Sequence, residues 1–393
     1  MQMDLRNLLL AGTRSVLVAC GLAVALAGTA NAGPREQAKR MHDRIAGVPP
    51  SASVLAAMEA DIAAGRNEDA AMRAMEHPSF YSVTLKNLAT PWTNRDRTVF
   101  APLNDYTATF IGMVRDDFPM NRLLSADVLY VGRAGLGLPG VSAASNDHYA
   151  EMENRHLDLR DALQATTQAS AYGLPPGAAA GVMTTRAAAQ AFFVAGTNRA
   201  MFRFTLLNHL CHDLEEIQDT SRPSDRIRQD VSRSPGGDSR LFLNNCVGCH
   251  SGMDPMAQAF AHYDYDEGQG RMTYSAGQVV SKYFNNDETF RPGYVTRDDR
   301  WDNYWRSGPN ALLGWDPSLP GSGAGASSLG EELGNSEAFA SCQVEKVFRT
   351  VCLRSPDDAA DRAQIGSMVA SFRSSGFRLK RVFADSAAYC MGQ

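Results

Sequence analysis

The sequence predicts a mainly α-helical protein with a helical N-terminal domain, a smaller central domain and a C-terminal helical hairpin or bundle. Apolar residues recur every three to four positions far more often than they alternate, which is the period of a helix buried on one side. Stretches rich in glycine, proline and serine separate these segments and indicate loops. A chain of 393 residues is long enough for two or three helical modules with a substantial core.

Residues 1–32 have the pattern of a secretory signal peptide. Arg6 and Arg14 supply positive charge, an apolar run covers residues 16–27, and Ala-Asn-Ala at 30–32 is a cleavage site of the A-x-A type. We therefore expect export to the periplasm and a mature chain that begins directly after this segment. The apolar run is short for a transmembrane helix, and no later segment is long enough to span a bilayer.

Cys20 offers a second interpretation of the same segment. Together with the three residues before it, Leu-Val-Ala, it looks like a lipoprotein signal in which Cys20 becomes the lipidated N-terminus. We favour this interpretation less for two reasons. Only a few apolar residues separate Arg14 from Cys20, and the hydrophobic stretch continues beyond the cysteine.

Residues 33–214 form the predicted helical N-terminal domain. Residues 134–146 are rich in glycine, serine and proline and predict a loop. Residues 187–212 predict a long helix with a break near Gly196. The shorter apolar stripes that predict helices in this domain are Val54, Met58 and Ile62, and then Tyr106, Phe110, Met113 and Val114.

Residues 215–240 are polar, contain two prolines and a Gly-Gly pair, and predict a linker into a domain at 241–335. Near its start this domain carries Cys246-Val-Gly-Cys249-His250, a CxxCH motif, which is the attachment signature of c-type haem. Each thiol adds to one haem vinyl group, and the imidazole that follows becomes the proximal ligand of the iron. The motif therefore predicts a single covalent haem c held by Cys246, Cys249 and His250.

Two other uses of a CxxC pair fit the sequence less well. A redox dithiol of the thioredoxin type needs a preceding strand in a βαβ context, and the sequence predicts none. A zinc site needs a second Cys or His pair at finger-like spacing, and the sequence has none.

The motif leaves the distal ligand of the iron open. Met272 is the first candidate because its spacing from the motif allows the chain to fold across the haem, whereas Met253 and Met256 follow the proximal histidine too closely. Arg271 is a candidate for a bidentate hydrogen bond with a haem propionate. A distal methionine raises the reduction potential and a second histidine lowers it, while an open position permits reactions with peroxide or small ligands. The other side chains considered for this position are Met368, Met391, His209, His212 and His262.

The remainder of the central domain is expected to be less regular. Asp254-Pro255 predicts a turn after the haem-bearing helix, and a short helix follows through Ala261. Residues 274–329 predict a long irregular region with a Gly/Ser tract at 321–330. This region holds three of the four tryptophans, which we expect to pack structurally: Trp301, Trp305 and Trp315.

Residues 336–393 are predicted to form the C-terminal helical domain. Two apolar stripes have helical spacing, Gly376 is a stop signal after the second, and a third helix begins near Leu379. We expect these stripes to face the core rather than a cofactor. The residues of the stripes are Val344, Val347, Phe348 and Val351, and then Ile365, Met368, Val369 and Phe372.

Cysteine usage and charge limit the possible environments and partners. Cleavage of the signal peptide leaves four cysteines besides those of the motif, and in an oxidising compartment they allow two disulfides in any of three pairings. The formal net charge is −5, and no basic stripe indicates nucleic acid as a partner. The four cysteines are Cys211, Cys342, Cys352 and Cys390.

Residues 246–271, CVGCHSGMDPMAQAFAHYDYDEGQGR, resemble the haem domain of a bacterial multi-domain cytochrome c family abundant in planctomycetes. The family pattern runs roughly CxxCHxxxDPxGxxLExFDxxGxxR. Asp254-Pro255 match it, Tyr263-Asp264 stand for its Phe-Asp pair, and Arg271 stands for its final arginine. The sequence departs from the pattern at the family's glycine, near Ala257 and Gln258, and at its Glu/Asn positions, near His262.

The resemblance extends over most of the mature chain, although more loosely. Residues 103–130 look like the family's N-terminal helical domain, 181–211 look like its approach to the haem, and 336–387 are similar to its short C-terminal domain. The resemblance implies a cytochrome c-like haem domain between two helical domains.

The sequence thus predicts an exported monohaem c-type cytochrome that passes single electrons between redox proteins of the envelope. Two alternatives stay open at this point. One is a haem enzyme with an open distal site, which is peroxidase-like or oxidises a substrate, and the size of the chain favours it. The other is a haem-bearing subunit of a larger envelope redox complex.

Overall fold

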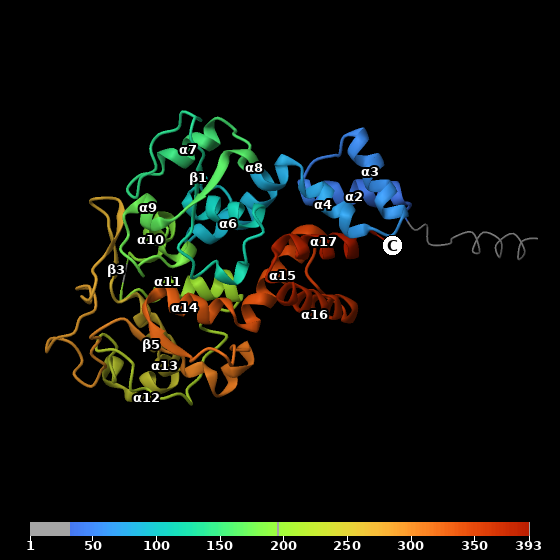
Figure 1. Ribbon diagram of the computed structural model, residues 1–393. Helices are drawn as coiled ribbons and strands as arrows, with labels where there is room; N and C mark the ends of the chain where they lie inside the picture. Colours follow the sequence, from blue (N-terminus) through green and yellow to red (C-terminus); the bar gives the residue numbers. More distant parts are fainter. Residues whose placement is uncertain (1–31, 195, 393) are drawn as a thin grey trace, which may run out of the picture.

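The computed structural model describes residues 32–194 and 196–392, and it confirms a mainly helical protein (Figure 1). Three two-stranded antiparallel sheets accompany the helices of the described residues. The signal peptide, apart from its last residue, and Cys20 lie outside the described part of the chain. Among the described helices, none combines the length and the apolar character that crossing a bilayer requires.

Three helices open the described chain: α2 (Pro34–Ala46), α3 (Ala52–Ala63) and α4 (Asn67–Met75). The start of α3 is set by Ser51, whose hydroxyl accepts a hydrogen bond from the Val54 amide. The buried Met58 and Ile62 confirm the predicted stripe of this helix.

The central helical region is organised around α6 (Asp105–Arg115), which the sequence predicts. The side chain of Asn104 caps its start, and ten of its eleven residues are buried. Strands β1 (Leu129–Gly132) and β2 (Leu163–Thr166) pair beside it, with Leu129 opposite Thr166. The other elements of this region are η1 (Phe80–Leu85), α5 (Lys86–Ala89), η2 (Thr90–Thr93), η3 (Met120–Arg122), α7 (Asp147–Asn154), α8 (Leu159–Ala162), α9 (Gln168–Tyr172) and η4 (Gly181–Thr184).

The helix predicted for residues 187–212 is interrupted, as expected, close to Gly196. It consists of α10 (Arg186–Phe192), α11 (Arg199–Thr205) and the π-helical turn η5 (Leu206–Leu210). Asn198 adopts a positive φ at the interruption. Its side-chain amide donates hydrogen bonds to the backbone carbonyls of Phe260 and Tyr263. The break therefore joins the N-terminal half of the chain to the segment after the CxxCH motif.

The motif region begins with the segment 211–238, which is irregular apart from a short 3-10 turn, and the linker expected at 215–240 stays a prediction. It continues through the helices at the bottom of Figure 1 and the hairpins beside them. Its elements are η6 (Pro235–Gly237), α12 (Ser239–Leu241), η7 (Phe242–Cys246), α13 (Val247–Ala257), η8 (Gln258–Phe260), β3 (Tyr263–Asp266), β4 (Arg271–Tyr274), β5 (Arg300–Asp302), η9 (Tyr304–Arg306), η10 (Pro309–Leu313) and β6 (Ser322–Ala324).

The predicted turn at Asp254-Pro255 is wrong, because both residues lie inside α13. A proline lacks the N–H that would bind the carbonyl of residue 251, so a helix interior usually excludes it. Here Asp254 is ion-paired with Arg199 of α11, and Gly252 lies against Trp305. These tertiary contacts outweigh the local preference and keep the helix continuous.

The irregular region predicted for 274–329 is shorter than expected, because α14 (Gly325–Gly334) already begins within the Gly/Ser tract. The glycines of α14 allow this helix to pack closely against the backbone of residues 121–124. A Cβ at Gly330 would lie 1.9 Å from the carbonyl oxygen of Leu124, and one at Gly334 would lie 2.1 Å from that of Asn121. The expectation of structural packing is confirmed for the tryptophans of this region, since all three are buried: Trp301, Trp305 and Trp315.

The C-terminal region consists of α15 (Glu337–Cys352), α16 (Ala359–Ser374) and α17 (Leu379–Cys390), and its apolar stripes are mostly buried as predicted. The structure confirms the two disulfides that the sequence allows, and it decides between the three possible pairings: Cys211–Cys342 and Cys352–Cys390. The first joins the end of η5 to α15, and the second joins α15 to α17.

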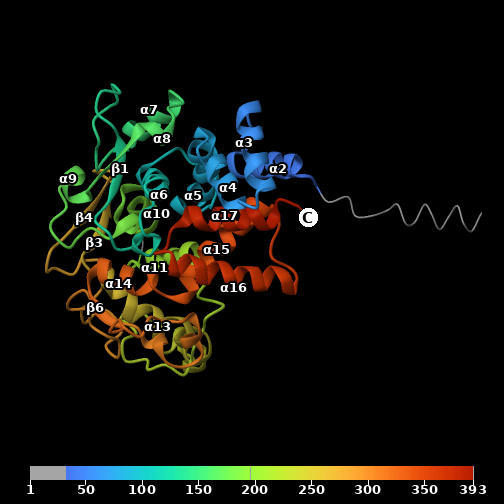
Figure 2. The ribbon, with the colours of Figure 1, turned by 45° about the vertical axis from the view of Figure 1, so that its right-hand side comes forward.

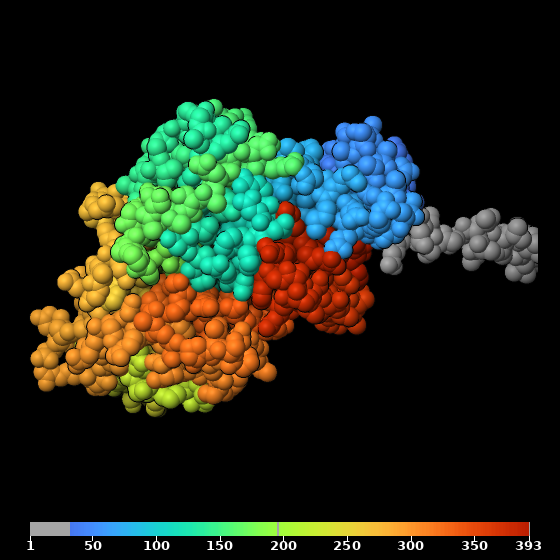
Figure 3. Space-filling view, viewed as in Figure 1, coloured from blue at the N-terminus to red at the C-terminus, as the bar shows by residue number. Residues whose placement is uncertain are grey.

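The first and last helices of the described chain pack together. Helices α2 and α4 lie against α17, next to α15 (Figure 2). These first helices and the C-terminal helices also form adjoining parts of one surface (Figure 3). One hydrophobic core extends from Ala38 to Ala387. The sequential division into domains at 33–214, 241–335 and 336–393 stays a prediction, and the packing groups residues 34–75 with the C-terminal helices.

Candidate haem-attachment site

The CxxCH motif lies where two helical segments join. The π-helical turn η7 ends at Cys246, and Cys249 and His250 belong to the first turn of α13. Such π-helical turns are rare and often occur at functional sites. Within the described residues, Cys246 and Cys249 are the cysteines without a disulfide, and both are partly exposed. The fold thus bonds the other four cysteines to one another and leaves this pair free.

Apolar side chains surround the start of the motif. Cys246 packs against a small cluster formed by Ile227, Phe242 and Val247. In the helical turns just before it, Leu241 is 45% exposed and Leu243 is 57% exposed. Leu243 lies three residues before Cys246, so the helical turns that lead into the motif leave large apolar side chains uncovered.

The imidazole of His250 is held by a carboxylate one turn further along α13. Its Nδ1 lies 3.0 Å from Oδ1 of Asp254, and residues four apart share one face of a helix. An ionised carboxylate only accepts hydrogen bonds, so Nδ1 carries the proton and donates it. Nε2 is then the nitrogen with a free lone pair, which is the form in which imidazole binds a metal.

Asp254 itself is completely buried and belongs to an ionic network. Arg199 donates to it from Nε at 2.6 Å and from Nη2 at 2.8 Å, and it also pairs with Asp230. Burial alone would raise the pKa of the Asp254 carboxyl, but the Arg199 guanidinium and the hydrogen bond from His250 hold this pKa well below its usual range. The carboxylate is therefore ionised throughout the physiological pH range.

The opposite face of α13 is closed by protein contacts. A Cβ at Gly252 would lie 2.0 Å from the indole Nε1 of Trp305, so a larger residue at this position would collide with the ring. Ser251 Oγ donates to the carbonyl of Asp219, whose amide donates to the carbonyl of Gly248. Residues 250 and 252 are about 200° apart around a helix, so these contacts lie away from His250, whose side chain is 22% exposed.

This arrangement is compatible with a c-type haem. Cys246 and Cys249 would form the thioether bonds, and His250 would coordinate the iron through Nε2. When bound, the haem would supply one-electron redox chemistry. The free thiols, the hydrogen-bonded imidazole and the uncovered leucines are the observations on which this fit depends.

The structure also bears on the two other uses of a CxxC pair. Burial raises the pKa of the Cys249 thiol, and the neighbouring carboxylates of Glu215 and Asp213 add to this effect, whereas a redox-active thiol needs a lowered pKa. A zinc site would bring further ligands to the two thiols. Over residues 32–194 and 196–392, the cluster with metal-ligand spacing is instead an acidic group away from the motif: Asp357, Asp358 and Asp361.

Arg271 and Met272, the predicted propionate and distal-ligand candidates, lie in the hairpin β3–β4, where they pair with Asp266 and Tyr265. This hairpin follows the C-terminal end of α13 and packs against α10, whereas His250 lies in the first turn of α13. Both ribbon views show the hairpin on the α10 side of the molecule (Figures 1 and 2). The structure thus does not bring these two residues to the motif, and their roles stay predictions.

The other candidate ligands are mostly engaged elsewhere. His209 is buried and hydrogen-bonded to the Tyr106 hydroxyl at 2.5 Å, and burial lowers its pKa well below the ordinary value. Met368 is buried between the C-terminal helices, which confirms its interpretation as a core residue. The remaining ones lie as follows: Met253 and Met256 are buried in α13, His262 is buried near Asp299, His212 lies near Glu216, and Met391 follows α17.

Sequence reasoning missed the network of Asp254, Arg199 and Asp230. A signal for its first member was present, because an acidic residue four positions after a histidine on a helix shares its face. The prediction of a turn at Asp254 hid that signal. No sequence pattern links Arg199 or Asp230 to the motif, because a break in the helix and an irregular segment bring them there.

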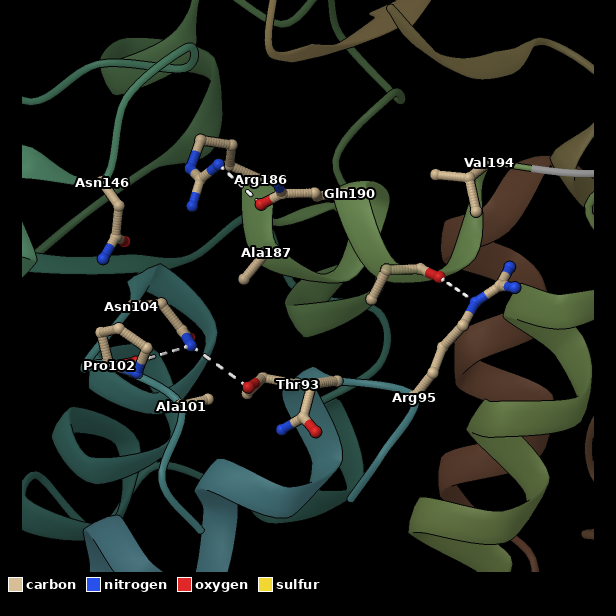
Figure 4. Close-up of a pocket in the computed structure, with 12 residues that line it drawn as sticks. Thr93, Arg95, Ala101, Pro102, Asn104, Asn146, Arg186, Ala187, Gln190 and Val194 are labelled. Carbon is tan, nitrogen blue, oxygen red and sulfur yellow. Dashed lines mark hydrogen bonds between the residues drawn. The ribbon is translucent and has the colours of Figure 1, made fainter. Parts of the chain in front are cut away.

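A separate cavity of about 620 Å³ lies in the N-terminal half, between α10 and the segment 93–104 (Figure 4). Its cationic side chains are engaged within the protein. Arg186 donates to the side chain of Gln190, and Arg95 donates to the carbonyl of Ala191. The CxxCH motif does not line this cavity.

Comparisons with protein-family models, with curated proteins and with solved structures found no match to this chain.

Proposed function

We propose that this chain is an exported monohaem c-type cytochrome that passes single electrons between redox proteins of the envelope. The observation that carries the proposal is the free pair Cys246 and Cys249, followed on the same helix by a histidine whose Nδ1 is hydrogen-bonded. This arrangement leaves two thiols for vinyl addition and Nε2 for the iron. The resemblance of residues 246–271 to a bacterial cytochrome c family agrees with a cytochrome c-like haem domain in the centre of the chain.

The proposed location is the periplasm. The pattern of residues 1–32 is that of a secretory signal. The disulfides Cys211–Cys342 and Cys352–Cys390 support an oxidising compartment. In most bacteria haem is attached to CxxCH motifs outside the cytoplasm, so these features and the motif support one another.

Visible spectra of the protein made with a haem-attachment system test the proposal. We expect a covalent haem c spectrum in the native protein and its loss in His250→Ala. The matched control is His156→Ala, which removes an exposed imidazole just after α7 and should leave the spectrum unchanged. A native protein without covalent haem, or a His250→Ala variant with an unchanged spectrum, would contradict the assignment.

A second candidate is a haem enzyme with an open distal position. The observation that favours it is the placement of Met272 in a hairpin at the far end of α13 from His250. Carbon monoxide distinguishes the two candidates, because it binds ferrous iron only at an open position. A low-spin spectrum unmoved by carbon monoxide supports electron transfer. A high-spin spectrum that shifts supports the enzyme.

A further inference from the structure

We infer that Asp254 is a positioning residue that orients His250 and makes its imidazole a stronger donor to the iron, so that the reduction potential of the haem is lowered. The inference rests on the proposed function, since it concerns the haem that His250 would bind. It goes further because it assigns a role to a residue outside the CxxCH motif.

The geometry gives Asp254 control of the ring. One carboxylate oxygen accepts from His250 Nδ1 at 3.0 Å, which fixes both the rotation of the imidazole and the nitrogen that carries its proton. The two residues lie four positions apart on α13, so the helix backbone itself sets their separation.

The carboxylate is in turn held in place by four hydrogen bonds. Oδ1 accepts from His250 Nδ1 and Arg199 Nε, while Oδ2 accepts from Arg199 Nη2 at 2.8 Å and from the Arg228 amide at 3.2 Å. Each oxygen therefore has two donors. Arg199 is itself paired with Asp230, so α13, α11 and the segment 228–230 are joined at this point.

The charge of this group acts on the iron through the imidazole. A carboxylate that accepts the Nδ1 proton increases the basicity of the ligating nitrogen. In a buried site this interaction is stronger than in water. A more basic ligand favours the more positive ferric state, so the couple shifts to lower potential. Arg199 opposes this effect, because its two hydrogen bonds draw charge from the same carboxylate.

A purely structural role makes a different prediction. If the ion pairs between Asp254, Arg199 and Asp230 only tie α13 to its neighbours, the loss of either acid should reduce stability, and neither loss should act on His250 specifically. Asp230 is the matched control, since it bonds to the same arginine but not to the imidazole.

The test compares Asp254→Asn and Asp230→Asn in the haem-loaded protein by redox titration. We expect Asp254→Asn to weaken the preference for the ferric state by at least tenfold, which is about 59 mV for a one-electron couple. Asp230→Asn should shift the potential by less than half as much. Equal shifts would assign the effect to net charge and overturn the inference, as would an unchanged potential in Asp254→Asn.

Nitrogen NMR gives a second readout, namely the chemical shift of the His250 ring nitrogens. It is recorded on the reduced protein, with carbon monoxide added if the iron is not already low-spin. The His250 Nδ1 resonance should move in Asp254→Asn and stay in place in Asp230→Asn. If Asp254→Asn does not fold, Arg199→Lys is the variant to measure. Lysine keeps the positive charge but cannot make both hydrogen bonds to Asp254, so less charge is drawn from the carboxylate and the reduction potential should fall. An unchanged or raised potential contradicts the inference. Absence of haem from the native protein is the distinct outcome that refutes the proposed function itself.

Discussion

The C-terminal helices and the CxxCH helix of this protein are held in place by different forces. Helices α15, α16 and α17 pack through continuous apolar stripes and carry both ends of one disulfide, Cys352–Cys390. Helix α13 is fixed instead by an ionic network at Asp254, by Trp305 against Gly252, and by backbone contacts from segments far away in the sequence. The first region is a scaffold, and the second carries the two free thiols of the motif.

The cysteines show the same contrast. Four of them form disulfides: Cys211, Cys352 and Cys390 lie at helix ends, and Cys342 lies within α15. The two of the motif lie on consecutive helical turns and remain free. The surroundings of a cysteine, rather than its presence, therefore separate the structural residues from the candidate cofactor-binding residues.

Removal of a disulfide should have the largest effect on stability. Loop-closure entropy predicts a loss of about 5 kcal/mol for the serine double variant of Cys211 and Cys342, and about 4 kcal/mol for that of Cys352 and Cys390, because the loops span 131 and 38 residues. Urea denaturation measures both losses. Haem attachment should survive in each folded variant, and a variant that folds but lacks haem would show that the two regions are not separable.

Phe348→Ala and Trp305→Ala compare one large buried side chain from each region. Both side chains are fully buried, so each truncation should cost about 3–5 kcal/mol in the free energy of unfolding. Only Trp305→Ala should also change the haem spectrum, because its ring lies against α13 behind the motif. A spectral change in Phe348→Ala of the same size would break the distinction between the regions.

Gly252→Ala and Gly366→Ala make the same change in two helices, and we expect opposite effects on the free energy of unfolding. At Gly252 the new methyl group collides with Trp305, which should destabilise the protein by about 1–3 kcal/mol. At Gly366 of α16 no atom lies within 4 Å of the added Cβ, and the helix should gain about 0.5–1 kcal/mol. Thermal unfolding measures both, and destabilisation at Gly366 would contradict the account of the scaffold.

The smallest effect concerns acid stability in the scaffold. Hydrogen bonds from Arg354 are the main cause that lowers the pKa of the Asp361 carboxyl. The folded pKa lies below the unfolded value of about 3.9, so the stabilisation is complete above that pH and is lost as the pH falls below about 4. The effect should be small because Arg354 is partly exposed. Asp361→Asn should flatten the decline in melting temperature between pH 5 and pH 3, and an unchanged decline would exclude this pair as its source.

The scaffold was largely predictable from the sequence, and the surroundings of the motif were not. The stripe from Val344 to Val351 and the stop signal at Gly376 are local patterns that a helix must follow. The continuation of α13 through Pro255 and the start of α14 in a Gly/Ser tract depend on contacts with distant residues. Local propensity is overruled there by tertiary packing, which a single sequence does not display.

The candidate site was predictable only where its chemistry is encoded by short spacing. The CxxCH pattern identifies three residues without any structure. Asp254 follows His250 by four residues, which is a signal that the sequence contains. Arg199 is 55 residues from Asp254 and 31 residues from Asp230, so no sequence pattern identifies Arg199 and Asp230 as neighbours of the motif. Conversely, Met272 has a spacing from the motif that would allow the chain to fold back over it, but it lies in the hairpin at the other end of α13.

Mass spectrometry of the protein made with a haem-attachment system tests the central claim most directly. After proteolysis, the peptide that contains Cys246 and Cys249 should carry the added mass of one haem, and the four disulfide cysteines should carry none. Replacement of both motif cysteines by alanine should abolish that mass increase. A motif peptide recovered with two unmodified thiols, or with the thiols joined as a disulfide, would contradict the account.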